Sequence, residues 1–148
     1  MSIRVRRPLT DRLELSEGDS ITVKRDLTAG EYRDLMRAST RPLQVTPSEV
    51  GAATTAKMEI DPIAAGLATV IAYLLDWTFL GADGQKLVIA DQPPDVVRAL
   101  LANIDSDAYM EVQRAVLDHQ SRRAADVAEE KKTRSGETSS AATLASVG

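Results

Sequence analysis

The chain has 148 residues, of which 43% are hydrophobic and 3% aromatic, with a formal net charge of −4 at pH 7 and a pI near 5.0. This length suggests one domain with a mainly aliphatic core, and the acidic balance argues against general binding of the nucleic-acid backbone. The absence of cysteine excludes disulfides, thiolate metal sites and a cysteine nucleophile.

The start of the chain carries no targeting signal that we recognise. Residues 1–7 are basic, but no apolar run follows them to make a signal peptide. The longest apolar run, residues 63–75, is shorter than the ~20 residues that a membrane span needs. We therefore expect a soluble, non-secreted protein.

Near the N-terminus, apolar and polar residues alternate in three short runs. The apolar members are Ile3 and Val5, Leu13 and Leu15, and Ile21 and Val23. A period of two predicts half-buried strands of a small antiparallel sheet, with a turn at residues 17–19. The arginines at positions 4, 6, 7 and 12 form either a phosphate-binding patch or the solvent face of this sheet. We favour the solvent face, because the alternation already explains them.

Thr28 and Glu31 have the spacing of a capping box, which predicts a short helix to about Ser39. Pro42 ends it, because the residue before a proline disfavours helix. Residues 42–58 are rich in Thr, Ala and Pro without a period, which predicts a mobile loop with a short strand at 43–46. A connection of this length is either a binding loop or a plain surface connection.

Residues 61–89 combine the most apolar helix pattern with a hairpin signal. Asp61 as N-cap and Pro62 begin the helix, which we expect to close at Asp76-Trp77. Ile63, Leu67, Val70, Ile71 and Leu74 share one apolar face, which we expect to pack inward. The opposite face carries the small residues Ala65, Ala68, Thr69 and Ala72, which allow another element to approach closely, so we expect the helix to be buried on more than one side. The Asp-Gly pair in residues 81–84 then predicts a tight turn between strands at 78–80 and 86–89.

Two more helices and a polar tail complete the chain. The first has an apolar face of Val96, Val97, Leu100, Leu101 and Ile104. The second runs from about Ser106 towards Lys131, with Tyr109, Val112 and Val116 inward, and its charged last turns are either solvated or a docking element. Low complexity over 133–148 predicts a disordered tail. The expected fold is thus α+β over residues 1–132, with an N-terminal antiparallel β segment and a mainly helical body containing one β-hairpin.

No residues form a recognisable catalytic, cofactor or metal site. His119 is the only histidine, and one histidine without a second histidine or a cysteine makes a poor transition-metal site, so we expect a solvated helix residue rather than an acid–base group. Asp76, Asp83 and Asp91 lack the spacing of a calcium loop and fit turns and helix ends. A hydrolase that uses Asp76 and His119 is the remaining enzymatic alternative.

Trp77 is the residue with the clearest ambiguity. Its structural role is a core anchor beneath the hairpin, and its functional alternative is a hot spot for a protein partner. The residues that we single out as protein-binding candidates are Trp77, Phe79, Tyr109, Val112 and Val116.

The order of elements resembles the tail assembly chaperones of long-tailed bacteriophages. The resemblance covers residues 10–132 and rests on four segments: "LTAGEYRDLM", "YLLDWTFLGADGQKLVI", "PPDVVRALLANID" and "VQRAVLDHQSRRAADVAEEKK". It is one of layout, and the Trp before an Asp-Gly hairpin and the "VVRALL" helix are its most specific parts.

This resemblance implies a non-enzymatic protein of the infected host cytoplasm. Such chaperones keep the long helical tape measure protein soluble and help tail tube subunits assemble around it, without cofactors, nucleic acid or membranes. Many are made in two forms by a programmed frameshift, and self-association stays open. The alternative is a structural virion protein of the tail, such as a tail-tube or head–tail connector subunit.

Overall fold

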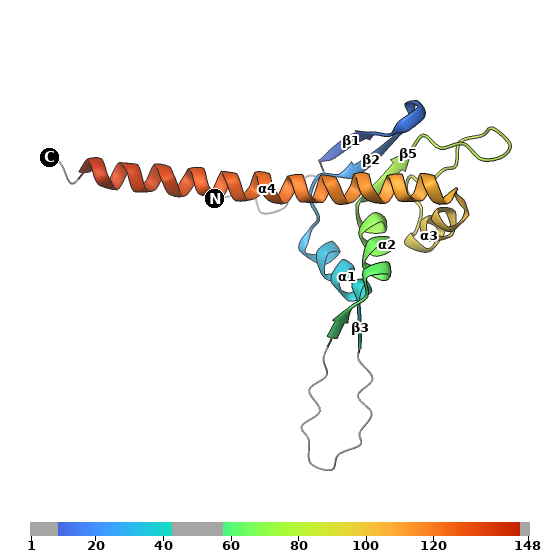
Figure 1. The fold of residues 1–148 in the computed structure, drawn as a ribbon, viewed down its shortest axis with the longest axis horizontal. Helices are drawn as coiled ribbons and strands as arrows, with labels where there is room; N and C mark the ends of the chain where they lie inside the picture. Colours follow the sequence, from blue (N-terminus) through green and yellow to red (C-terminus); the bar gives the residue numbers. More distant parts are fainter. Residues whose placement is uncertain (1–8, 43–57, 146–148) are drawn as a thin grey trace, which may run out of the picture. The chain divides into compact units, whose positions relative to one another are not determined.

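A computed structural model describes the backbone of residues 9–42 and 58–145, and the side chains of residues 9–40 and 59–134. The predicted strand at Ile3 and Val5, the arginines at 4, 6 and 7, and the strand and loop at 43–57 lie outside the described residues. The chain separates into two compact units, Met1–Val116 and Leu117–Gly148. Small antiparallel sheets and several helices make up the fold (Figure 1), so the predicted α+β class is confirmed.

Unit 1 contains a three-stranded antiparallel sheet in the order β1-β2-β5. Strand β1 (Thr10–Glu14) pairs with β2 (Ser20–Lys24), with Thr10 opposite Lys24. The predicted turn between them is a short 3-10 segment, η1 (Ser16–Gly18), in which Glu17 and Gly18 have positive φ angles of 58° and 79°. Because β2 is the middle strand, its Ile21 and Val23 side chains are completely buried.

Helix α2 (Pro62–Tyr73) begins as predicted but ends earlier. The Asp61 carboxylate accepts hydrogen bonds from the backbone N–H groups of Ile63 and Ala64, at 3.1 and 3.3 Å. After Tyr73 the backbone becomes extended and forms β5 (Leu74–Trp77), which pairs with β2. The prediction that the helix closes at Asp76-Trp77 is therefore wrong, because pairing along the free edge of β2 overrides the local helix pattern.

The Asp-Gly turn forms, but with less strand pairing than predicted. Gly84 has a φ of 76°, and the Gly81 N–H donates to the Gln85 carbonyl at 2.7 Å. A single bridge, Leu80 with Lys86, replaces the two predicted strands in this part of the described chain. One reason is that the indole N–H of Trp77 donates to the Leu87 carbonyl at 2.7 Å, which uses an acceptor that a strand ladder would need.

Helix α1 (Ala29–Ser39) has the predicted capping box. The Thr28 hydroxyl accepts from the Glu31 N–H at 3.2 Å, and the Glu31 carboxylate accepts from the Thr28 N–H at 3.0 Å. Desolvation raises the pKa of Glu31, but hydrogen bonds from Lys24 and Thr28 together outweigh it and leave that pKa lowered. Directly after α1, β3 (Thr40–Pro42) pairs with β4 (Met58–Ile60), with Thr40 opposite Ile60.

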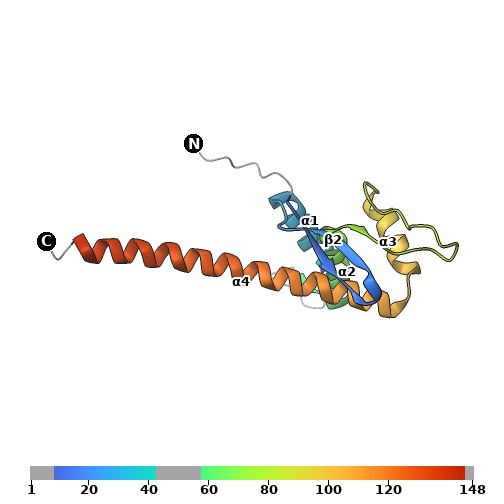
Figure 2. The ribbon, with the colours of Figure 1, turned by 90° about the horizontal axis from the view of Figure 1, so that it is seen from above.

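The core of unit 1 lies between the sheet and the helices. Helix α3 (Pro94–Asn103) contributes Val97 and Leu101, and the first turns of α4 (Ser106–Ala145) contribute Val112 and Val116. Figures 1 and 2 show the loop after β5 extending from the side of unit 1 away from α1. The buried apolar residues are Ile21, Val23, Val70, Tyr73, Leu74, Trp77, Ile89, Val97, Leu101, Val112 and Val116.

Helix α4 (Ser106–Ala145) starts as predicted and continues beyond Lys131. Unit 2 begins inside it, at Leu117. The backbone of residues 133–145 continues this helix. Once a helix is nucleated, each further residue adds a backbone hydrogen bond at little cost, so a helix can extend into poor helix formers. No helix in the described ranges combines the length and the apolar character of a membrane span.

Candidate functional site

The predicted protein-binding residues belong to one core. Trp77 is 1% exposed and Val112 and Val116 are fully buried, while Phe79 and Tyr109 are partly buried against the same cluster. The Trp77 and Phe79 rings are tilted, with centroids 5.1 Å apart. The interpretation of Trp77 as a core anchor is confirmed. Partner binding by these five residues stays a prediction, and only Phe79 and Tyr109 among them have side-chain surface to offer.

Helix α2 instead presents apolar surface to the outside. Its twelve residues carry no charge, yet only four of them are buried: Gly66, Thr69, Val70 and Tyr73. On the opposite side of the helix, the side chains of Ala64, Leu67, Ala68 and Ile71 form an apolar stripe with the spacing i, i+3, i+4 and i+7, and each is partly exposed. Ile63 in the first turn is 86% exposed. We call this the α2 surface, which consists of Ile63, Ala64, Leu67, Ala68 and Ile71.

A close contact at Gly66 explains why the face of α2 that contains Gly66 is the buried one. A Cβ atom added at Gly66 would lie 2.1 Å from the Gln113 Nε2 atom of α4. The Gly66 side of the helix therefore faces its neighbours, as expected for a helix whose small residues allow close approach. The prediction that Ile63 packs inward is wrong, because the inward face is centred on Gly66 rather than on the largest side chains.

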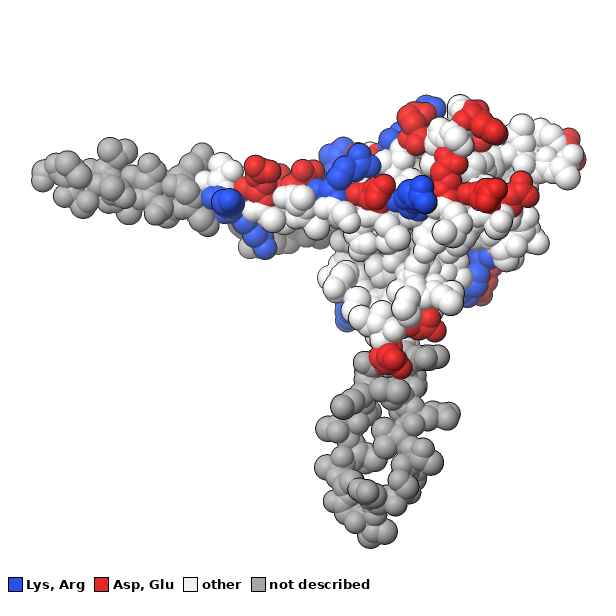
Figure 3. All heavy atoms as spheres, viewed as in Figure 1, with Lys and Arg blue, Asp and Glu red and all other residues white. Residues whose placement is uncertain are grey.

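More exposed apolar side chains lie on the elements next to α2. Met36 and Tyr32 share one face of α1, and Ile60 directly precedes the N-cap of α2. Ile60 lies opposite Thr40, whose hydroxyl donates to the Met36 carbonyl at 3.1 Å, so these residues occur in one region. Figure 3 shows a broad uncharged area over α1 and α2. Exposed apolar area of this kind is typical of a protein-binding surface.

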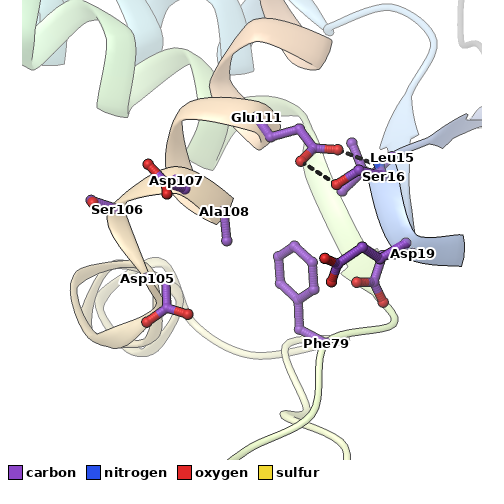
Figure 4. A pocket seen from close by; sticks show the side chains of 10 residues that line it. Leu15, Ser16, Asp19, Phe79, Asp105, Ser106, Asp107, Ala108 and Glu111 are labelled. Carbon is purple, nitrogen blue, oxygen red and sulfur yellow. Dashed lines mark hydrogen bonds between the residues drawn. The ribbon is translucent and has the colours of Figure 1, made fainter.

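Unit 1 also has a pocket of about 440 Å³ at the β1–β2 turn. The Phe79 ring points into it, as Figure 4 shows, between the turn and the start of α4. Five carboxylates line it: Glu17, Asp19, Asp105, Asp107 and Glu111. Chemically, such a pocket can accept a cationic side chain, because it provides negative charge beside an aromatic ring.

Two of these carboxylates already have partners inside the protein. Glu111 accepts hydrogen bonds from the Ser16 backbone N–H and, at 2.8 Å, from the Ser16 hydroxyl. Asp19 accepts from the Thr78 hydroxyl at 2.9 Å. The backbone N–H of Ser16, followed by its hydroxyl, lowers the pKa of Glu111. The bonds from Ser16 to Glu111 connect the β1–β2 turn to α4, and the bond from Thr78 to Asp19 connects the turn to the residue after β5, which gives the pocket a structural role.

Replacing Glu111 with glutamine is expected to destabilise unit 1 at pH 7, because a charged acceptor of two hydrogen bonds is lost. The pKa of Glu111 is lowered from 4.5 by folding, so its contribution is present above the unfolded value and disappears as the pH falls through the folded value. Urea unfolding from pH 7 to pH 3 should show the variant and the wild type converging below pH 4.5. The control is Glu17→Gln in the same pocket. An equal loss of stability in both variants would contradict the specific role of Glu111.

The other residues considered for chemistry have structural surroundings. His119 is 4% exposed, so the expectation of a solvated histidine is wrong. Asp76 accepts from the Trp77 N–H at 2.9 Å and from Lys86 Nζ at 3.2 Å, and Asp83 accepts from the Gln85 N–H at 3.1 Å. Among the described residues, no group of three or more His, Asp or Glu side chains is arranged to hold a metal ion.

The sequence draws attention to the apolar helix and its face of small residues, but the five residues of the α2 surface are not singled out from it, although a signal for them is present. Residues 62–73 carry no charge on any face, and Ala64, Leu67, Ala68 and Ile71 already have helical spacing. A helix that is apolar on all sides must be covered on all sides, either by its own chain or by a partner. Comparisons with protein-family models, with curated proteins and with solved structures find no match for this chain.

Proposed function

We propose that this protein is a non-enzymatic tail assembly chaperone of a long-tailed bacteriophage, which binds the tape measure protein in the host cytoplasm and helps the tail tube protein assemble around it. The observation that carries the proposal is the α2 surface, an uncharged helix face that its own chain leaves partly uncovered. The layout resemblance to such chaperones gives the class of partner.

The α2 surface has the chemistry of a helix-binding site. An amphipathic partner helix places apolar side chains at i, i+3, i+4 and i+7 into an apolar surface. Ala64 and Ala68 let a partner backbone approach closely, and Ile63, Leu67 and Ile71 supply aliphatic contacts. A long helical protein with exposed apolar stripes would otherwise aggregate, so covering them keeps it soluble.

Substituting Ile63 with aspartate is expected to abolish co-purification with a helical fragment of the tape measure protein from the same genome. A charge at the exposed end of the α2 surface would have to be desolvated on binding. The fold should tolerate it, because Ile63 is exposed and an acidic residue in the first turn favours a helix. The measurement is the amount of soluble tape measure fragment recovered with the chain after co-expression.

Leu80→Asp is the matched control for this experiment. Leu80 is 63% exposed and lies on the loop after β5, outside the α2 surface. It should leave the recovery of the fragment unchanged. If the wild-type chain neither solubilises nor co-elutes with the fragment, the proposed function fails. If both aspartate variants reduce recovery equally, the α2 surface is not the binding site.

The second candidate is a structural subunit of the virion tail. The observation that favours it is the edge strand β1, whose outer side has no strand partner within the described residues and could pair with a neighbouring subunit. Mass spectrometry of purified particles separates the two proposals. A chaperone should be absent from the particle, whereas a tail-tube or connector subunit should be present at a fixed copy number.

We do not propose a hydrolase that uses Asp76 and His119. His119 is almost fully buried, and the Asp76 carboxylate is held by Lys86 and the Trp77 backbone. A general base needs a position from which it reaches a substrate proton, and neither residue lies among those that line the pocket at the β1–β2 turn.

A further inference from the structure

Unit 2 is a single helical segment, and one of its faces is suited to pairing with another helix. From Leu117 to Arg134 most side chains are exposed, including Leu117 at 39% and Val127 at 38%. His119 is the one buried side chain of this segment among the residues that the structure describes, and a mostly polar helix with few buried side chains is only marginally stable in water. A heptad pattern places six residues of this segment on one face: Leu117, Gln120, Ala124, Val127, Lys131 and Arg134.

The charges beside this face complement one another in a specific way. Arg123 and Glu130 are seven residues apart, so they lie on the same flank of the face. They have opposite charges, and Glu129 lies on the far side of the helix. Within its own chain, Arg123 forms an ion pair with Asp126 at 3.7 Å, which pairing with a second copy would have to share or replace. In an antiparallel pair of helices, a flank of this type meets the same flank of the second helix.

We propose that two copies of this chain associate through antiparallel pairing of the α4 segments of unit 2. With Ala124 opposite Val127 of the second copy, Arg123 of each chain lies opposite Glu130 of the other. Because the pair has two-fold symmetry, the contact between Arg123 of one chain and Glu130 of the other occurs twice in the dimer. The arrangement also places Lys131 opposite Gln120 rather than opposite another charge.

The antiparallel direction follows from the same residues. In a parallel, in-register pair, Lys131 would face Lys131 of the second copy, and Arg123 would no longer face Glu130. A second copy is the occupant that the charges indicate, because the face contains both members of each ion pair. The apolar contact is small, so the association should be weak and sensitive to salt.

Sedimentation equilibrium of the full chain tests the proposal. The wild type should show a reversible monomer–dimer equilibrium, and Glu130→Arg should weaken the association about tenfold, because two attractive pairs become repulsive. The double variant Arg123→Glu/Glu130→Arg should restore it. Glu129→Arg is the matched control, with the same charge change one residue away on the far face, and should associate like the wild type.

Cross-linking then tests the direction of the helices. The natural chain has no cysteine, so single cysteines can be introduced without a background. In a mixture of Ala124→Cys and Val127→Cys chains, antiparallel pairing should give the mixed disulfide, whereas parallel pairing would give Ala124→Cys homodimers.

Two outcomes would overturn the inference. The first is a wild-type chain that stays monomeric at all concentrations, and the second is an equal effect of the changes at 129 and 130. In the first case, a complex with a tape measure fragment that Glu130→Arg weakens would show that the face binds that partner instead. Neither of the two outcomes depends on whether the α2 surface binds the tape measure protein.

Discussion

Replacing Trp77 with alanine is expected to lower the free energy of unfolding by about 3–5 kcal/mol, the range for removing a large buried aromatic side chain. Trp77 is 1% exposed and ends β5, and its ring packs beside Phe79. Its indole N–H donates to the Leu87 carbonyl at 2.7 Å. The substitution would leave a cavity and remove the hydrogen bond that holds the Asp-Gly loop. Because the only tryptophan is lost, urea unfolding should be followed by far-UV circular dichroism.

Two further variants test this expectation: one separates the lost buried area from the lost indole hydrogen bond, and the other is a control on the same loop. Trp77→Phe keeps much of the buried area but loses the indole donor, so its cost should be clearly smaller than that of Trp77→Ala. Leu80→Ala, at an exposed position on the same loop, should change stability by no more than about 0.5 kcal/mol. A Trp77→Ala variant as stable as the wild type would mean that the residue does not anchor this core.

The local features of the fold were the ones that could be predicted from sequence. Thr28 with Glu31, and Asp61 with Pro62, determine helix starts through hydrogen bonds within three or four residues. The apolar faces of α3 and α4 were mostly correct, because Val97, Leu101, Val112 and Val116 recur at helical spacing and each face has one packing side. Such features need no knowledge of distant residues.

The errors occur where distant residues decide the structure. Leu74 and Asp76 continue a helical pattern, yet they lie in β5 because β2 offers a free edge. Ile63 is the largest apolar residue at the start of α2, yet it is exposed because Gln113, from α4, packs against Gly66. Neither contact has a signal within a window of a few residues. A pattern can therefore show that a helix is apolar without showing which of its faces is covered.

The candidate site depends on the same distinction. Trp77 is a candidate because tryptophan often anchors an interface, and Val112 and Val116 are candidates because they lie on the late helix, a possible docking element. All three side chains are buried in the core. The α2 surface is built from alanines and aliphatic residues that are less conspicuous in sequence. It is recognised only when the burial of each face of α2 is known.

Replacing Val70 with aspartate is expected to lower the free energy of unfolding by about 4 kcal/mol or more, because a charge would be placed where no water reaches it. Val70 is fully buried on the inward face of α2, in the core cluster with Tyr73 and Trp77. A domain of this size has about 5–15 kcal/mol of stability in total. The variant should therefore be largely unfolded or strongly destabilised in urea titrations.

Ile63→Asp is the control on the same helix, and it makes the comparison a direct test of how α2 is oriented. Both variants introduce one aspartate in place of a β-branched aliphatic residue, but Ile63 is 86% exposed whereas Val70 is 0% exposed. The free energy of unfolding should change by no more than about 0.5 kcal/mol in Ile63→Asp, because its carboxylate stays in water at the helix N-terminus. Equal losses in the two variants would mean that Ile63 is covered by its own chain. The α2 surface would then be part of the core rather than free for a partner, and loss of tape measure binding in Ile63→Asp would report unfolding instead of a broken interface.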